Sequence, residues 1–246
     1  MKMSHAPQSV PAPHPSGLRP IAKHVLLSAA LTVVVLAVSW VLAGRIFWLP
    51  VLGFVLGSGA VAVLLSRHWS GSSLGAANAL TLMRLALAAL MLLPIARPDL
   101  TQGATGWAIF ALALMTLALD GLDGPLARRS GLAGPWGARF DMEVDAVFGL
   151  LLALVVWRSG AAGVWVLLLG GMRYLFVLAS FALPWLAQPL PQRFRRKLVC
   201  VLQIGALVVM LAPLVTPPLS QWIALVALGL LTWSFALDVT WLARRK

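Results

Sequence analysis

The stretch LDGLDGPLARRSGLAGPWGARFDMEVDAVF, residues 119–148, holds most of the acidic side chains of this protein. The full sequence contains seven Asp and Glu residues. Five of them lie in this stretch: Asp120, Asp123, Asp141, Glu143 and Asp145. Because carboxylates are costly in apolar surroundings, acids gathered in so apolar a chain indicate a functional site.

The rest of the sequence predicts an all-α integral membrane protein. Hydrophobic residues make up 61% of the chain, charged residues 11%, and the mean hydropathy is +0.93. Most apolar runs approach the roughly 20 residues that a helix needs to cross a bilayer, and they lack the alternation of barrel strands. Eight helices are expected, near residues 25–43, 46–65, 79–95, 104–122, 142–157, 161–184, 198–214 and 220–241.

Three parts are expected along the chain. Residues 1–24 are rich in Pro, His and Ser and are predicted to be a disordered cytoplasmic tail. Residues 25–66 are expected to form an accessory pair of transmembrane helices. A segment with several Gly and Ser residues follows, and residues 76–246 are expected to form a six-helix catalytic core.

The net charge of +12 indicates membrane topology rather than nucleic-acid binding. The cations lie mainly in the short segments between apolar runs and at both termini, where they can also contact anionic lipid headgroups. The positive-inside rule then places both termini and the acidic stretch in the cytoplasm. The expected location is a bacterial inner membrane, and no nucleic-acid partner is expected.

The spacing of the acids predicts that four of them converge. Asp120 and Asp123 share a helix face with Gly124 and Ala127, and the pair at 141 and 145 shares a face of the next helix. Four carboxylates suit two hard divalent cations such as Mg²⁺ or Mn²⁺, a pair that stabilises displacement at phosphorus. The alternative is structural, with salt bridges to nearby arginines and glycines that allow tight helix packing.

The same residues resemble a family signature. Asp120-x2-Asp123-Gly124-x2-Ala127-Arg128-x8-Gly137-x3-Asp141-x3-Asp145 matches all eight fixed positions of the CDP-alcohol phosphotransferase pattern. The block from about residue 76 onward also resembles the six-helix core of this family, most closely bacterial members similar to phosphatidylglycerophosphate synthases. The resemblance implies an enzyme that transfers the phosphatidyl group of CDP-diacylglycerol to an alcohol and releases CMP.

The resemblance also implies residue roles. Asp120, Asp123, Asp141 and Asp145 would hold two divalent cations, with Asp145 also acting as general base on the acceptor hydroxyl. The cytidine nucleotide would be bound by Gly124, Ala127, Arg128 and Gly137. Glu143 matches no position of the signature and is left out of the expected site.

A second segment, AANALTLMRLALA at residues 76–88, is expected to support the nucleotide pocket. It resembles an N-x-L-T-x-x-R segment that is frequent in the family. Asn78, Thr81 and Arg84 lie broadly on one side of a helix and would face the nucleotide. The alternative, weighed equally, is an Asn helix cap with an Arg that snorkels to the interface.

Further cations are expected to bind the acceptor. Arg173 lies within an apolar run, so it must face a polar cavity or a partner acid. Arg195, Arg196 and Lys197 precede the next apolar run, where they either bind phosphate or anchor the helix at anionic lipid headgroups. A phosphorylated acceptor such as glycerol 3-phosphate or an inositol phosphate would fit both groups. Asp238 is expected to pair with the cations of the C-terminal ARRK.

Two functions from different classes remain open at this point. The first is the membrane phosphotransferase, with CDP-diacylglycerol, an alcohol acceptor and membrane lipids as partners. A homodimer is compatible with this function. The second is a divalent-cation transporter that uses the aspartates as its ion site. A transporter site would lie near the membrane midplane, whereas these acids flank a loop expected in the cytoplasm.

Overall fold

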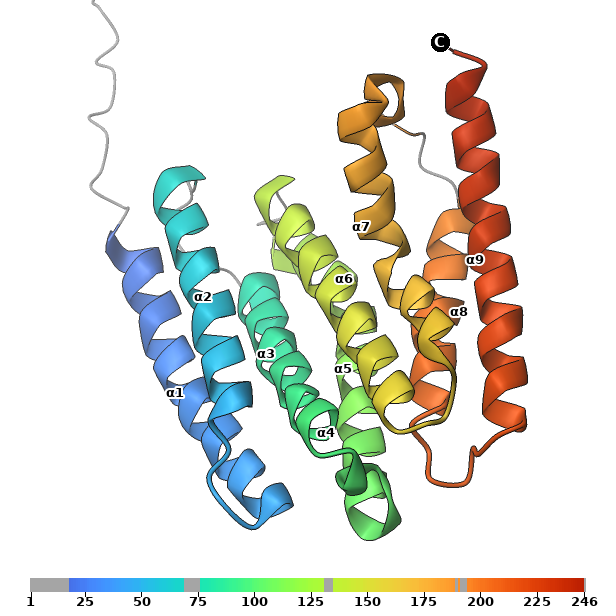
Figure 1. Ribbon diagram of the computed structural model, residues 1–246. Helices are drawn as coiled ribbons and strands as arrows, with labels where there is room; N and C mark the ends of the chain where they lie inside the picture. Colours follow the sequence, from blue (N-terminus) through green and yellow to red (C-terminus); the bar gives the residue numbers. More distant parts are fainter. Residues whose placement is uncertain (1–17, 69–75, 131–134, 189, 191–193, 246) are drawn as a thin grey trace, which may run out of the picture.

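The computed structural model describes residues 18–68, 76–130, 135–188, 190 and 194–245, and it gives the backbone but not the side chains of residues 18–20, 65–68, 76–77, 122–130, 135–136 and 138. The described part is all-helical and contains no strand. Figure 1 shows that α1 begins and α9 ends at the same end of the molecule. An even number of membrane crossings requires this arrangement.

Nine α-helices and three short 3-10 helices make up the described part. The leading hairpin is α1 (Leu18–Ala43) and α2 (Trp48–His68), followed by α3 (Ala76–Leu90), α4 (Leu92–Ala96), η1 (Pro98–Thr101) and α5 (Gly103–Ser130). The second half contains α6 (Pro135–Arg158), η2 (Val164–Val166), α7 (Leu167–Ala182), η3 (Pro184–Ala187), α8 (Phe194–Val209) and α9 (Leu219–Ala243). Counting α3 and α4 as one broken helix, the predicted core of six helices after a leading pair is confirmed.

Five segments are long and apolar enough to cross a membrane, namely 21–43, 78–96, 103–121, 164–182 and 219–243. The described apolar part of α2, Trp48–Leu64, is shorter, and α8 has only 16 residues. Helix α6 carries three acids on its first half. The chain is therefore a multi-pass membrane protein.

Several expected boundaries differ from the structure, and two of them involve a proline. Helix α1 begins at Leu18, inside the segment predicted to be a tail, because Pro20 lies in its first turn, where proline is tolerated. The helix expected at 79–95 breaks at Met91. Pro94 has no N–H to donate to the carbonyl of Leu90, and its ring crowds that carbonyl, so α3 ends and α4 begins there.

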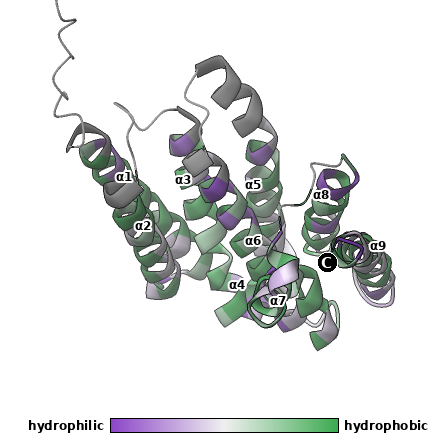
Figure 2. Cartoon of the chain, turned by 90° about the horizontal axis from the view of Figure 1, so that it is seen from above, coloured by the Kyte–Doolittle hydropathy of each residue, from purple (hydrophilic) through white to green (hydrophobic). Residues whose placement is uncertain are grey.

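The packing order explains how the site is built. The leading hairpin packs against α3, and α3 packs against α5 and α6, which barely touch each other within the described residues. Helix α6 then packs against α7 and α8, and α9 against α8 and α7. Figure 2 shows hydrophilic residues on α3, α5 and α6 among largely hydrophobic helices.

The hairpin is joined by a small polar cluster. The buried side chain of His24 on α1 lies 3.1 Å from the carbonyl oxygen of Ser58 on α2. The Ser58 hydroxyl donates to Ser28 Oγ at 2.7 Å. These hydrogen bonds fix the register of α1 and α2 inside an otherwise apolar contact.

At the opposite end from the termini, Arg97 and Asp99 form an exposed pair between α4 and η1. Arg97 donates from Nε to Asp99 Oδ1 at 2.9 Å and from Nη2 to Oδ2 at 2.7 Å. These hydrogen bonds hold the pKa of the Asp99 carboxyl below its usual value and raise the pKa of Arg97. The pair is remote from the acidic stretch and provides matched control positions.

Candidate active site

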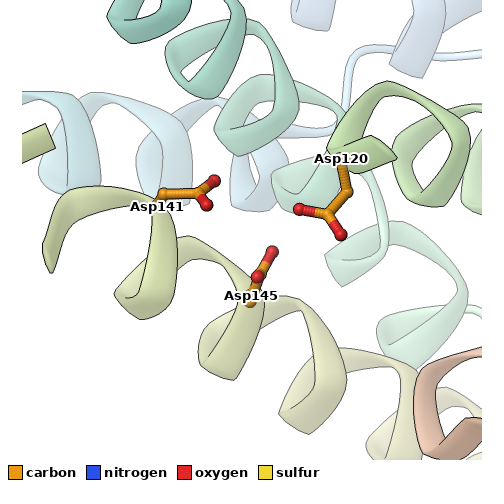
Figure 3. A group of neighbouring side chains, drawn as sticks. All are labelled: Asp120, Asp141 and Asp145. Carbon is orange, nitrogen blue, oxygen red and sulfur yellow. The ribbon is translucent and has the colours of Figure 1, made fainter. Parts of the chain in front are cut away.

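Three aspartates converge between α5 and α6. Asp120 comes from α5, whereas Asp141 and Asp145 lie one turn apart on α6, and Figure 3 shows the three carboxylates pointing toward a common space. One oxygen from each carboxylate lies within 4.8 Å of the others. The side chains keep about a quarter to a third of their surface exposed, so the cluster is reachable from solvent.

The guanidinium of Arg84 lies in the middle of this cluster. Its Nη2 contacts Asp120 Oδ1 at 2.8 Å and donates to Asp145 Oδ1, while its Nη1 donates to Asp141 Oδ1. Only 1% of the Arg84 side chain is exposed. A snorkelling arginine would reach the interface, so that alternative for Arg84 is wrong.

Arg84 reaches all three acids because of where α3 lies. Helix α3 packs against both α5 and α6, and Arg84 is on the buried side that faces them. Asn78 and Thr81 lie on the same helix and are also buried. The aspartates of α5 and α6 therefore meet around the guanidinium of a residue on α3.

The residues present fit a divalent cation. Among the described side chains of the cluster, three carboxylates face one guanidinium, so these four groups together carry a net negative charge in partly buried surroundings. All the donor atoms are carboxylate oxygens, the ligands that Mg²⁺ and Mn²⁺ prefer. The expected convergence of Asp120, Asp141 and Asp145 is thus found, and the group could hold a metal ion.

Four further signature residues lie on the C-terminal turns of α5: Asp123, Gly124, Ala127 and Arg128. Their side chains lie outside the described residues, so their expected contacts stay predictions. The backbone does show that α5 continues without a break to Ser130. Asp120 and Asp123 are therefore on one continuous helix, as their spacing predicts.

Gly137 at the start of α6 lies directly against Asn78 of α3. A Cβ atom at position 137 would lie 3.0 Å from Asn78 Oδ1. Such a contact is closer than packed side chains normally allow, so the glycine is what lets the two helices approach here. The structure thus brings together two of the expected nucleotide-binding residues, one from each segment.

A cavity of about 610 Å³ opens beside the aspartates between α6, α7, α8, α9 and η3. Asp145 lies in its wall, together with two of the cations expected to bind the acceptor, Arg173 and Arg196. Much of the remaining lining is apolar. The polar or reactive side chains that line it are Gln188, Cys200, Gln203, Ser180, Ser234 and Asp238.

Arg173 has an acidic partner that sequence reasoning excluded from the site. Its Nη2 contacts Glu143 Oε1 on α6, and Glu143 is more than half exposed. The signal that could have identified Glu143 is the need of a membrane arginine for an acid, combined with the antiparallel packing of α6 and α7. Arg173 therefore has both of the expected environments, because it lines a cavity and contacts a partner acid.

The three cations at 195–197 have different surroundings. Arg195 donates to the carbonyl oxygen of Ser234 at 2.9 Å and contacts Asp238 Oδ1 at 2.7 Å, so it joins α8 to α9. Arg196 lies 3.9 Å from Asp238 Oδ2 and reaches the cavity, whereas Lys197 is exposed and is not among the described lining residues.

Asp238 was expected to pair with the C-terminal ARRK. Within the described residues its partners are instead Arg195 and Arg196 of α8. The reason is that α8 and α9 pack side by side, which brings the cations preceding the apolar run of α8 to the last turns of α9.

The chain was compared with known proteins. A family model described as CDP-alcohol phosphatidyltransferase matches residues 74–233. No curated protein and no solved structure matches the chain. The matched segment includes all three clustered aspartates and excludes the leading hairpin of α1 and α2.

Proposed function

Because the chain belongs to the CDP-alcohol phosphatidyltransferase family, we propose that it transfers the phosphatidyl group of CDP-diacylglycerol to an alcohol acceptor and releases CMP. Family membership makes the chain a membrane phosphotransferase that uses a CDP-alcohol and an alcohol acceptor. It favours an enzyme over the cation transporter. The identity of the lipid donor and the roles of single residues are the proposal.

The observation that carries the proposal is that Asp145 belongs both to the aspartate cluster and to the cavity wall. Its carboxylate is part of the aspartate cluster, and the same side chain lies in the wall of the cavity. A general base must lie within hydrogen-bond reach of the hydroxyl that it deprotonates, and that hydroxyl must lie beside the phosphorus under attack. Asp145 is the only aspartate of the cluster among the described residues that line the cavity, which supports its assignment as this base.

The proposed reaction is a displacement at the phosphorus that bears diacylglycerol. The acceptor oxygen forms a bond to this phosphorus while the bond to the bridging oxygen of the diphosphate breaks. Asp145 takes the hydroxyl proton, and CMP leaves with the bonding electrons. The products are CMP and a lipid in which the phosphatidyl group is joined to the new alcohol.

Members of the family depend on divalent cations, and we assign the binding of these cations to Asp120, Asp123, Asp141 and Asp145. The assignment is two ions, Mg²⁺ or Mn²⁺, in line with the number of carboxylates. Such ions would neutralise the diphosphate oxygens and stabilise the charge that develops on the leaving CMP. By holding the ions, Asp120, Asp123 and Asp141 would also position the diphosphate relative to Asp145.

The nucleotide half is assigned to the place where α3 meets the start of α6. Gly137 and Asn78 meet there, with Thr81 buried on the same helix. Gly124, Ala127 and Arg128 on the end of α5 complete the proposed cytidine pocket. Small residues there leave space for a flat base, and Arg128 can pair with phosphate oxygens.

The cavity is assigned to the acceptor. Arg173 and Arg196 lie in its wall together with Asp145, and these two cations favour an acceptor that carries a phosphate, such as glycerol 3-phosphate or an inositol phosphate. Arg195 and Lys197 are proposed to contribute positive charge at the cavity edge. An acceptor phosphate would compete with Glu143 for Arg173.

The proposed location is a bacterial inner membrane, with the site and both termini in the cytoplasm. The shared end of α1 and α9 in Figure 1 and the excess of cations outside the apolar runs support this orientation. CDP-linked lipids and charged polyol phosphates would reach the site from that side.

An acceptor panel tests the proposal. Purified protein in lipid nanodiscs receives CDP-diacylglycerol labelled in its phosphatidyl phosphate, Mg²⁺ and one alcohol: glycerol 3-phosphate, glycerol, inositol phosphate, inositol or serine. We expect one labelled lipid product, formed in equal amount with CMP and faster with a phosphorylated alcohol than with its unphosphorylated partner. Folded protein that yields no labelled lipid with any alcohol would refute the proposed function.

A further inference from the structure

The aspartate cluster already contains a cation that belongs to the chain itself. Arg84 is almost completely buried and contacts one oxygen of each of the three carboxylates. An arginine guanidinium stays protonated under all ordinary conditions. Without this charge, three carboxylates within 4.8 Å of one another would repel strongly in surroundings of low dielectric constant.

We propose that Arg84 is the resident counter-cation of the site and that a divalent ion binds by exchange with its guanidinium. This inference rests on the proposed function, because it takes Asp120, Asp141 and Asp145 as the metal ligands. It adds a residue outside the acidic signature to the metal cycle. Arg84 is thus a positioning residue for the carboxylates rather than a nucleotide ligand.

Geometry supports exchange rather than simple addition. Nη2 of Arg84 bridges Asp120 and Asp145, while Nη1 contacts Asp141, so the guanidinium fills the space between the oxygens that an ion would share. Two oxygens bound to one Mg²⁺ lie at most about 4.2 Å apart, given Mg–O distances near 2.1 Å. The guanidinium and such an ion would therefore compete for the same carboxylates.

Electrostatics acts in the same direction. A divalent ion bound to these carboxylates would lie next to a guanidinium of the same sign in a partly buried space. Part of the free energy of metal binding is therefore spent on displacing Arg84. The apparent metal affinity of the wild-type site is weaker than that of the same carboxylates without the arginine. The metal-free protein gains the corresponding stability.

The test of the exchange measures metal binding and unfolding, and CMP release by the wild-type protein is assayed separately. Wild-type protein, Arg84→Met and Arg84→Lys are titrated with Mn²⁺ in detergent while free Mn²⁺ is followed by electron paramagnetic resonance. Thermal unfolding is recorded in EDTA and in saturating Mn²⁺. Arg97→Met is the matched control, because Arg97 pairs with Asp99 far from the cluster.

We expect Arg84→Met to bind Mn²⁺ at least tenfold more tightly than wild type and to unfold at a lower temperature in EDTA, with most of this loss recovered in Mn²⁺. Arg84→Lys keeps the charge but cannot reach three carboxylates at once, so it should be intermediate in both measurements. Arg97→Met should match wild type. If Arg84→Met proves too unstable to purify, Arg84→Lys alone decides, since the exchange requires its Mn²⁺ affinity to rise.

Unchanged or weaker Mn²⁺ binding in both Arg84 variants would overturn the exchange. So would a loss of thermal stability that is equal in EDTA and in Mn²⁺, since a purely structural arginine predicts that result. If the wild-type protein still binds Mn²⁺ and releases CMP, the proposed function stands while the exchange fails. Wild-type protein that binds no Mn²⁺ would refute both.

Discussion

Gly137 on α6 and Asn78 on α3 lie so close that a single added carbon would touch: a Cβ at position 137 would lie 3.0 Å from Asn78 Oδ1. The contact joins the acidic signature to the N-x-L-T-x-x-R segment. It therefore connects two motifs that are far apart in the sequence, and a substitution at one should disturb the other.

Gly137→Ala should reduce CMP release about tenfold, because the added methyl group shifts Asn78 and with it the proposed nucleotide pocket. Gly171→Ala is the matched control. Gly171 is also helical, but a Cβ there would meet nothing within 4 Å, so only its helix propensity changes. Initial rates with CDP-diacylglycerol measure both variants. Equal rates would show that the contact has no role in catalysis.

Asp145→Asn should lower CMP release at least 100-fold, as expected when a general base and metal ligand is lost. The protein should still elute as a folded species in detergent, because asparagine has the same shape. Asp99→Asn removes a carboxylate from the remote pair with Arg97 and should leave the rate unchanged. Near-normal turnover in Asp145→Asn would remove this residue from the proposed reaction.

Chelation should stop the reaction. EDTA removes the divalent ion that the aspartates are proposed to hold, and the rate of CMP release should return when excess Mg²⁺ or Mn²⁺ is added. The rate is measured before chelation, after it and after each metal is added back. Activity that persists in EDTA after extensive dialysis would contradict the assignment of the cluster.

Arg173→Gln should raise the KM for a phosphorylated acceptor about tenfold, the effect expected when a charge-assisted hydrogen bond is lost. The KM for CDP-diacylglycerol and for unphosphorylated glycerol should stay as in wild type. Arg158→Gln is the control: Arg158 ends α6 at the other end of the helix and donates to the carbonyl oxygen of Ile95. A KM that rises equally for both alcohols would argue against phosphate binding by Arg173.

Arg195→Met should act on stability more than on the acceptor KM. The substitution leaves Asp238 with its weaker partner Arg196 in a largely buried position, at a cost of about 2 kcal/mol. The unfolding temperature in detergent should fall, and Asp238→Asn in the same chain should restore part of it. A normal unfolding temperature with a raised acceptor KM would instead make Arg195 an acceptor ligand.

The sequence was sufficient for the helical core and for the meeting of Asp120 with Asp141 and Asp145. Their spacings fix a shared helix face within each helix, and a short connection between the two helices brings the faces to the same end. The break at Met91 could also have been read from Pro94, whose missing N–H acts on the helix directly.

The sequence was not sufficient for contacts between distant helices. The membrane helices are apolar on most sides, so periodicity does not say which face meets which neighbour. Nothing in the spacing of the acids indicates that α3 packs against both α5 and α6 or that Arg84 faces three aspartates. For the same reason Asp238 was assigned to the wrong cations.

The cavity beside Asp145 is also lined by Cys200, the single cysteine of the chain. Cys200 is a free cysteine and an exposed residue in the described structure. A thiol-specific fluorophore would therefore label unmodified protein at one place, against the wall of the proposed acceptor cavity. The wild-type chain thus carries its own reporter of occupancy, and protection of the thiol by a bound alcohol could rank acceptors without following turnover.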